Sequence, residues 1–310
     1  MTELKEIEST IVIKTDEDRV TPVQRLSPSA INTYFKCPRQ FFYQYMCKLP
    51  TLPSIHLIKG TIVHSVLEDL FRGFKKDPVQ LTEQLFIKRW EKNSKVLTEL
   101  DLEPVELEQH RKDAYNMVMD YATDFAKKMQ NLIDAGKVEN LQHAYYMLKP
   151  KFREQRLEIE LECDGEKFTM VGILDRVHEG WDNTLTIADY KTSSKYGPGL
   201  SEEYRRQLAI YAYLYSITQK KTPDFVAIVF LRYGEEFLLE VTPSLLRYAR
   251  ESILEVFRKT RSVEIEDYPL KESPLCRWCS FQSVCNGEKD YKDAMREARM
   301  KKLIKKGEKK

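Results

Sequence analysis

The chain has 310 residues, of which 42% are hydrophobic and 32% are charged, and its net charge is +2. This composition is typical of a soluble, highly charged globular protein with one large domain or two small ones. No apolar run approaches the roughly 20 residues that cross a membrane, and we expect no signal peptide because the N-terminus is acidic and polar. Because the charge is nearly balanced, any basic surface must be local. The sequence also lacks a G-x-x-x-x-G-K-[S/T] stretch, which excludes a recognisable P-loop motor.

The N-terminal part begins with a polar stretch. Residues 1 to about 24 predict a polar arm, with a short strand at 11–13. Ser27 and Pro28 then indicate the start of a helix, as its N-cap and its first helical residue. Pro38 predicts that this helix breaks or restarts ten residues later.

A second helical pattern contains a histidine. Apolar residues with helical spacing surround His64, and Glu68 lies one turn further on the same side. A lone helical histidine is usually a packed or surface residue, so a ligand role needs other support. Residues 77 to about 149 then predict amphipathic helices at 81–97, at 105–133 and near Leu141.

Two alternating runs, at 152–162 and 167–178, predict a pair of antiparallel strands. The Asp-Gly dipeptide at 164–165 is the strongest short-range signal for a two-residue hairpin turn. Counting back from this turn along both strands places Glu154 opposite Asp175. A one-residue slip would send Asp175 to the opposite face.

The next strand, 185–192, ends in an acidic residue and a lysine. A three-residue loop at 181–183 places Asp175 opposite Asp189, and Lys191 shares a face with Asp189 because alternate strand residues point the same way. An aspartate and a lysine at a strand end are also compatible with an ordinary surface ion pair. Three aligned carboxylates repel one another, which a divalent cation relieves because hard cations prefer oxygen ligands. The alternative is a solvated sheet face of alternating charge.

After the sheet, residues 201–218 predict a helix on which Gln207 and Tyr211 share a face. This pair is also compatible with the polar stripe of an ordinary amphipathic helix. The remaining pattern predicts strands at 224–231 and 237–241, a helix at 243–260, and a basic tail at 289–310 that is a frayed helix or a disordered segment.

The six cysteines fall into two groups. Cys276, Cys279 and Cys285 form a C-x2-C-x5-C cluster, which without a secretion signal favours a metal site over disulfides. Thiolate sites suit zinc or an iron–sulfur cluster, and either needs a fourth ligand. Cys37, before the proline that interrupts the first helix, is the best candidate, and it would tie the two ends of the chain together. The other two are better explained as packed thiols: Cys47 and Cys163.

This ordered set of motifs resembles the RecB-like branch of the PD-(D/E)XK nucleases, which includes the AddB nuclease domain and the iron–sulfur nucleases associated with CRISPR adaptation. One departure is Leu174, which stands where the superfamily name has proline. The matching residues are Leu26-Ser27-Pro28-Ser29 through Cys37-Pro38-Arg39, then Gly60, His64, Glu68, Glu154, Gly172, Asp175, Asp189, Tyr190, Lys191, Gln207, Tyr211, Cys276, Cys279 and Cys285.

The resemblance implies an α/β fold. Its core would be restriction-endonuclease-like, a mixed central sheet flanked by helices, with an iron–sulfur staple joining the N- and C-terminal parts. The helical insert is predicted by the sequence pattern at 77–149 and is not explained by the family motifs. We expect six segments: an arm at 1–25, N-terminal helices with one cluster cysteine and the motif histidine at 26–76, the insert at 77–149, the nuclease core at 150–262, the cysteine cluster at 263–288 and a basic tail at 289–310.

The resemblance also implies a metal-dependent active site. Asp175 and Asp189 would bind Mg²⁺ or Mn²⁺, with His64 and the Tyr190 carbonyl as further ligands. Lys191 would position or activate the attacking water. The remaining implied roles are these: Glu154 as a further acidic member of the catalytic set, Gln207 and Tyr211 in holding the site and the DNA, and Cys37, Cys276, Cys279 and Cys285 as ligands of a [4Fe-4S] cluster, with structural Zn²⁺ as the alternative.

The implied function is that of a DNA exonuclease acting on single strands or DNA ends, in DNA repair or recombination, CRISPR adaptation or phage DNA processing. A helicase or a CRISPR-adaptation protein would be its partner, and we expect a cytoplasmic or nucleoid-associated location. The alternative is a non-catalytic DNA-binding subunit of a helicase–nuclease or recombination complex.

Overall fold

The computed structural model describes residues 20–193 and 200–307. Of these, residues 24–32, 52–193 and 200–258 form a larger compact unit, and residues 20–23, 33–51 and 259–307 form a smaller one. The strand expected at 11–13 lies outside the described residues. No helix within the described ranges is long and apolar enough to cross a membrane.

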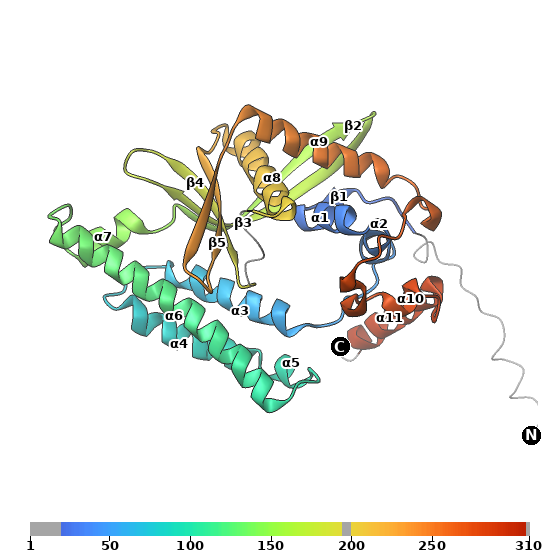
Figure 1. Ribbon diagram of the computed structural model, residues 1–310, viewed down its shortest axis with the longest axis horizontal. Helices are drawn as coiled ribbons and strands as arrows, with labels where there is room; N and C mark the ends of the chain where they lie inside the picture. The colour runs from blue at the N-terminus through green and yellow to red at the C-terminus, as the bar shows by residue number, and fades with distance from the viewer. Residues whose placement is uncertain (1–19, 194–199, 308–310) are drawn as a thin grey trace, which may run out of the picture. The chain divides into compact units, whose positions relative to one another are not determined.

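The larger unit is built on a mixed sheet (Figure 1). Strand β3 pairs antiparallel with β2 and β4, β4 pairs parallel with β5, and β5 pairs antiparallel with β6. A very short strand, β1, pairs parallel with β3 at Thr169 and Met170. The strands are β1 (Arg25–Leu26), β2 (Phe152–Cys163), β3 (Glu166–Glu179), β4 (Leu185–Lys191), β5 (Phe225–Phe230) and β6 (Glu235–Glu240).

The predicted strand registers are confirmed. Cys163 pairs with Glu166 across the Asp-Gly turn. The pairs Arg153–Arg176 and Gln155–Leu174 flank Glu154 and Asp175, and the pair Arg176–Ala188 is adjacent to Asp175 and Asp189. Glu154 itself has a left-handed φ of 45°, so β2 is locally distorted where this acidic residue meets the site.

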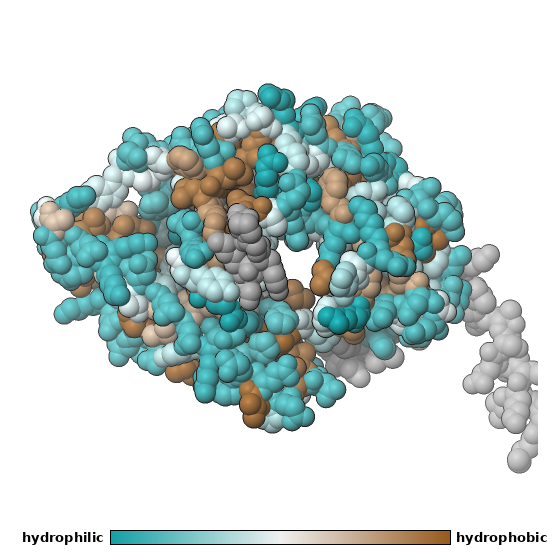
Figure 2. Space-filling view, in the orientation of Figure 1, coloured by the Kyte–Doolittle hydropathy of each residue, from teal (hydrophilic) through white to brown (hydrophobic). Residues whose placement is uncertain are grey.

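Three helices cover one face of the sheet. Buried side chains of α3 (Ile55–Leu70), α4 (Pro78–Lys92) and α6 (Pro104–Asp134) pack with Ala188 and Ala227 of the central strands. Phe86 of α4 lies in this core and is fully buried. The predicted helical insert therefore shares its core with the sheet. Its surface is predominantly hydrophilic along α6 (Figure 2), and two short helices complete it, α5 (Ser94–Thr98) and α7 (Leu141–Leu148).

Helix α8 (Glu202–Gln219) lies on the other side of β4 (Figure 1). Its residue Gln207 donates a hydrogen bond to Asp189 of β4. Because adjacent strand residues point to opposite faces, Asp189 lies on the face opposite Ala188. The approach of α8 to β3 requires a glycine: a Cβ on Gly172 would lie 2.7 Å from the Leu214 side chain. Helix α9 (Pro243–Lys259) packs beside it, with Phe257 stacked on Phe168 of β3 at 3.9 Å between ring centroids.

The smaller unit has an aromatic core. Tyr268 is fully buried against Phe41 and Phe42. The segment expected as a basic tail is largely the helix α11 (Tyr291–Gly307), whose first residue packs its ring on Phe42 at 5.7 Å. The other elements are the end of α1 (Pro28–Lys36), α2 (Pro38–Phe41), a π-helical turn (Phe42–Met46), two 3₁₀ turns (Ile265–Asp267 and Pro274–Trp278) and α10 (Gln282–Cys285).

Candidate active site

The site lies where β3 and β4 separate. The last pair of their ladder is Arg176–Ala188. Asp175, which comes just before Arg176 in β3, therefore has no ladder partner in β4. Its Oδ2 instead accepts a hydrogen bond from the N–H of Tyr190 at 2.7 Å. The Asp175 carboxylate thus accepts a hydrogen bond from a Tyr190 N–H that has no partner in the β3–β4 ladder. This hydrogen bond fixes the carboxylate at the opening where the two strands separate.

Helix α3 brings His64 to this opening. Ser54 caps the start of the helix, and the neighbouring Val63 and Val66 are fully buried in the core, so the imidazole is held at the rim. Its Nε2 lies 3.1 Å from the carbonyl oxygen of Tyr190. The Tyr190 carbonyl thus faces Nε2, whereas Nδ1 faces the carboxylates of Asp175 and Glu154, and the role of that carbonyl as a metal ligand stays a prediction.

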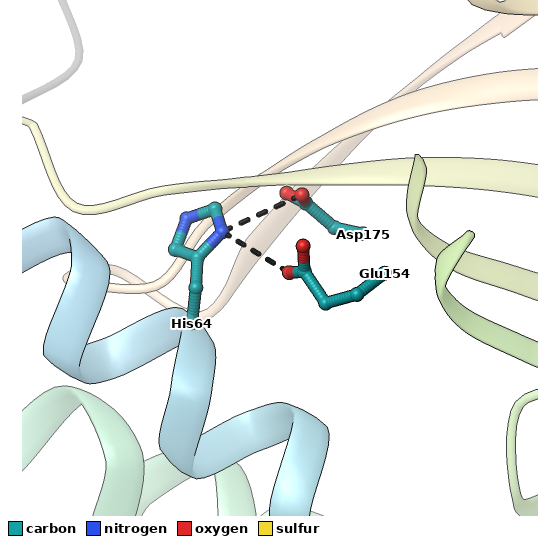
Figure 3. A group of neighbouring side chains, drawn as sticks. All are labelled: His64, Glu154 and Asp175. Carbon is teal, nitrogen blue, oxygen red and sulfur yellow. Dashed lines mark ion pairs between the residues drawn. The ribbon is translucent and has the colours of Figure 1, made fainter. Parts of the chain in front are cut away.

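Three side chains form a compact group with metal-ligand chemistry (Figure 3). The Nδ1 of His64 lies 3.4 Å from Oδ1 of Asp175 and 3.8 Å from Oε1 of Glu154. One ligand atom from each of the three residues lies within 4.8 Å of the other two. Burial would lower the pKa of His64, but hydrogen bonds to Asp175 and Glu154 and the charges of Asp175 and Asp189 outweigh burial and raise that pKa to about 10. A protonated imidazole therefore balances the two carboxylates.

The same donor set fits a divalent metal ion. Two carboxylates and one imidazole suit Mg²⁺ or Mn²⁺, since such ions bind few protein carboxylates and keep several waters. The imidazole must lose its proton to act as a ligand, so metal binding and deprotonation of His64 are coupled. Glu154, whose role the sequence left uncertain, belongs to this compact group, whereas the Asp189 side chain is turned toward other partners.

Asp189 and Lys191 form a buried pair on β4. Oδ2 of Asp189 lies 2.6 Å from Nζ of Lys191. Asp189 is only 3% exposed, which rules out the ordinary surface ion pair. Burial, together with the charge of Asp175, raises the pKa of Asp189 to about 6, although Lys191 opposes the shift. Burial would lower the pKa of Lys191, but the charge and the hydrogen bond of Asp189 outweigh burial and raise that pKa. The side chain is therefore an ammonium at neutral pH.

Helix α8 supplies the groups that hold this pair. Gln207 donates from Nε2 to Oδ1 of Asp189 at 2.9 Å and accepts at Oε1 from Nζ of Lys191 at 3.0 Å. Its Nε2 also lies 3.0 Å from the hydroxyl of Tyr211. The two residues expected to share a face of this helix thus both reach the site.

The four cysteines predicted to act together line one pocket of the smaller unit, which has a volume of about 550 Å³. Burial raises the pKa of Cys285, and the charges of the other three thiols add to the shift. Cys47 is buried, and Cys163 belongs to the larger unit. The four are Cys37, Cys276, Cys279 and Cys285, and the group that they bind stays a prediction.

Sequence reasoning missed a second set of side chains beside the active site. His56, Lys59, His110, Asp113 and Arg232 line a pocket of about 800 Å³ together with residues of the active site. One signal was available, since residues 56, 60, 64 and 68 recur at four-residue spacing and all line this pocket. The other members come from elements distant in the sequence.

A mixed sheet flanked by helices, with carboxylates and a lysine gathered where the strands part, fits the restriction-endonuclease-like class of fold. The sequence pattern of the PD-(D/E)XK nuclease superfamily matches residues 25–286. The chain belongs to this superfamily, whose nucleases use divalent metal ions.

Two solved structures are similar to this chain at low identity. One is a "putative exonuclease" from Eubacterium rectale, with 14% identity, a TM-score of 0.43, and coverage of 85% of this chain and 88% of the other. The second is SSO0001, with 15% identity, a TM-score of 0.30, and coverage of 74% and 96%. None of the curated proteins matches the chain.

Proposed function

We propose that this protein is a metal-dependent DNA exonuclease of the RecB-like branch, which hydrolyses phosphodiester bonds of single strands or DNA ends. The observation that carries the proposal is the meeting of two groups at one opening between β3 and β4. These groups are the His64–Glu154–Asp175 cluster and the buried Asp189–Lys191 pair.

The proposed reaction is the attack of water on a phosphodiester: a P–O bond to the water oxygen forms, the P–O bond to one nucleoside oxygen breaks, and the proton of the water passes to solvent. A divalent ion held by His64, Glu154 and Asp175, with Asp189 close by, would supply Lewis-acid stabilisation of the charge that develops on the phosphate. Lys191 is protonated at neutral pH because Asp189 raises its pKa. In this charge state it would orient the attacking water and stabilise negative charge as a hydrogen-bond donor.

We also propose that the four pocket cysteines hold a [4Fe-4S] cluster, as the resemblance to the RecB-like branch implies. Four thiols that line one pocket suit an iron–sulfur cluster, with tetrahedral zinc as the alternative. Acid-labile sulfide and iron in anaerobically purified protein would test this, whereas zinc in a colourless protein would replace the cluster.

The biological setting rests on the resemblance alone. It favours DNA repair or recombination, CRISPR adaptation or phage DNA processing, with a helicase or a CRISPR-adaptation protein as partner.

The nuclease proposal is tested by degradation of end-labelled single-stranded DNA with Mg²⁺, Mn²⁺ or EDTA. Wild type should shorten the strand only with metal, and Lys191→Ala and Asp189→Ala should each lose at least about a hundredfold in rate. Lys167→Ala is the matched control, because this exposed lysine of β3 forms an ion pair with Glu160 at the surface. DNA binding without cleavage in either metal would overturn the proposal in favour of a non-catalytic DNA-binding subunit.

A further inference from the structure

The pocket beside the active site carries an unusual charge distribution. Lys59 of α3 is only 3% exposed, and its Nζ lies 3.8 Å from Oδ2 of Asp113 on α6. Arg232, which follows β5, lies 2.8 Å from the same oxygen. One carboxylate is thus shared by two cations, so Lys59, Asp113 and Arg232 together carry one net positive charge. A buried ammonium that is incompletely neutralised is costly, and an additional anion would relieve it.

Two histidines complete the group. The rings of His56 and His110 meet edge to face at 5.3 Å between centroids. Nδ1 of His110 is buried and has no hydrogen-bond partner among the described residues. Burial lowers the pKa of His110, and the charges of Lys59 and His56 lower it further. The negative charge of an anion in the pocket would oppose that electrostatic effect. We call His56, Lys59, His110, Asp113 and Arg232 the basic pocket.

The basic pocket is continuous with the active site. The same cavity, of about 800 Å³, is lined by His64, Glu154 and Lys191 as well as by the basic pocket residues. A nucleic-acid strand that places one phosphate at Lys191 must place its neighbouring phosphates close by, because they recur along the backbone. The cavity therefore offers a second anion site on the path of the same strand.

We propose that the basic pocket binds a phosphate group of the substrate strand adjacent to the phosphate that is cleaved, an inference that rests on the proposed nuclease function. The net charge of +1 matches the single negative charge of an internal phosphodiester. A terminal phosphate carries up to two negative charges and would be matched after protonation of one histidine. Anchoring a second phosphate would fix the register of the strand at the active site.

The test is the affinity of a dye-labelled oligothymidine, measured by fluorescence anisotropy in EDTA, where the proposed nuclease cannot cleave. Arg232→Gln should weaken binding about tenfold, since a charge-assisted hydrogen bond to phosphate is lost. It should also reduce the slope of log affinity against log salt by about 0.7, the value for one phosphate contact on a single strand. Asp113→Asn should tighten binding, because it removes the one negative charge of the basic pocket.

The control is Lys128→Gln, which removes a cation from the same helix as Asp113 but at an exposed ion pair with Asp124. It should leave the affinity unchanged. If Arg232→Gln lowers the melting temperature, His110→Gln replaces it, because the buried Nδ1 of His110 has no partner to lose. If Arg232→Gln, His110→Gln and Asp113→Asn all leave the affinity and the salt slope unchanged, the proposal that the basic pocket binds a phosphate is wrong. The nuclease proposal would be unaffected by that result. Wild type that binds but never cleaves would overturn the nuclease and not the anion site.

Oligonucleotides with different ends show whether the basic pocket binds an internal phosphodiester or a terminal phosphate. Strands that carry either a phosphate or a hydroxyl at the 5′ end, and likewise at the 3′ end, are compared with wild type and Arg232→Gln. Equal affinities in wild type assign the basic pocket to an internal phosphodiester. A preference of wild type for one phosphorylated end, lost in Arg232→Gln, assigns it to that terminal phosphate.

Discussion

The side-chain amide of Gln207 donates a hydrogen bond from Nε2 to Oδ1 of Asp189 at 2.9 Å. The other end of the same amide accepts a hydrogen bond from Lys191 at 3.0 Å. Because one planar group spans both partners, it fixes the carboxylate and the ammonium relative to each other. Gln207 is therefore a positioning residue for the proposed reaction.

Replacing Gln207 by alanine should lower kcat about 10- to 100-fold, the usual cost of losing a partner that orients a reactive group. KM should change little, because Lys191 still carries its charge. Single-turnover cleavage over a range of DNA concentrations separates the two effects. Gln219→Ala, an exposed position at the end of the same helix, is the control. A rise in KM with unchanged kcat would assign Gln207 to DNA binding instead.

Glu154→Gln tests the composition of the metal-binding cluster. Glutamine removes the negative charge 3.8 Å from His64, so Mn²⁺ should bind about tenfold more weakly in a calorimetric titration. Glu158→Gln is the matched control, because this residue of the same strand is half-exposed and pairs with Arg25 and Arg156. Equal Mn²⁺ affinity in wild type and Glu154→Gln would place the ion on Asp175 and Asp189 without Glu154.

The strand registers followed from the sequence because turns fix them locally. The Asp-Gly turn and the short loop before β4 each set the pairing of the strands beside them, so residues 154, 175 and 189 could be brought into line by counting. Spacing on a helix likewise placed Gln207 and Tyr211 on one face. These relationships depend on periodicity and short turns, which are encoded within a few residues.

Other features depend on contacts that no local pattern encodes. Strand β1 has two residues, too few to show alternation, and it forms by pairing with a strand more than a hundred residues later. The left-handed φ at Glu154 and the end of the β3–β4 ladder at Arg176 and Ala188 have no signal in the local sequence. Lys59 and Arg232 meet at Asp113 only because three separate elements pack together. Their chemistry was visible in the sequence, but their proximity was not.

The helical segment 77–149 should unfold together with the sheet. Phe86 of α4 is fully buried in the core that includes Ala188 and Ala227. Phe86→Ala should therefore cost about 3–5 kcal/mol, the usual range for deleting a buried phenylalanine, measured by urea unfolding. Ile87→Ala, at the neighbouring 46% exposed residue, should change stability by less than about 0.5 kcal/mol. Two separate transitions in wild type would mean that the helical segment folds independently.

Cys47 should resist alkylation in the native protein even though it lies in the same unit as the four pocket cysteines. Burial raises its pKa to about 12, and because the thiolate is the reactive form, its reactive fraction near pH 8 is roughly a thousandfold below that of an ordinary thiol. Native protein treated with iodoacetamide between pH 7 and 9 should show no modification of Cys47 by peptide mass mapping, and denatured protein should show complete modification. Removing the proposed cluster with a chelator should expose Cys37, Cys276, Cys279 and Cys285 to the reagent and leave Cys47 protected, since burial protects it independently of any bound group. Modification of Cys47 at the same rate as the other four after chelation would show that the cluster, and not the aromatic core, holds this unit together.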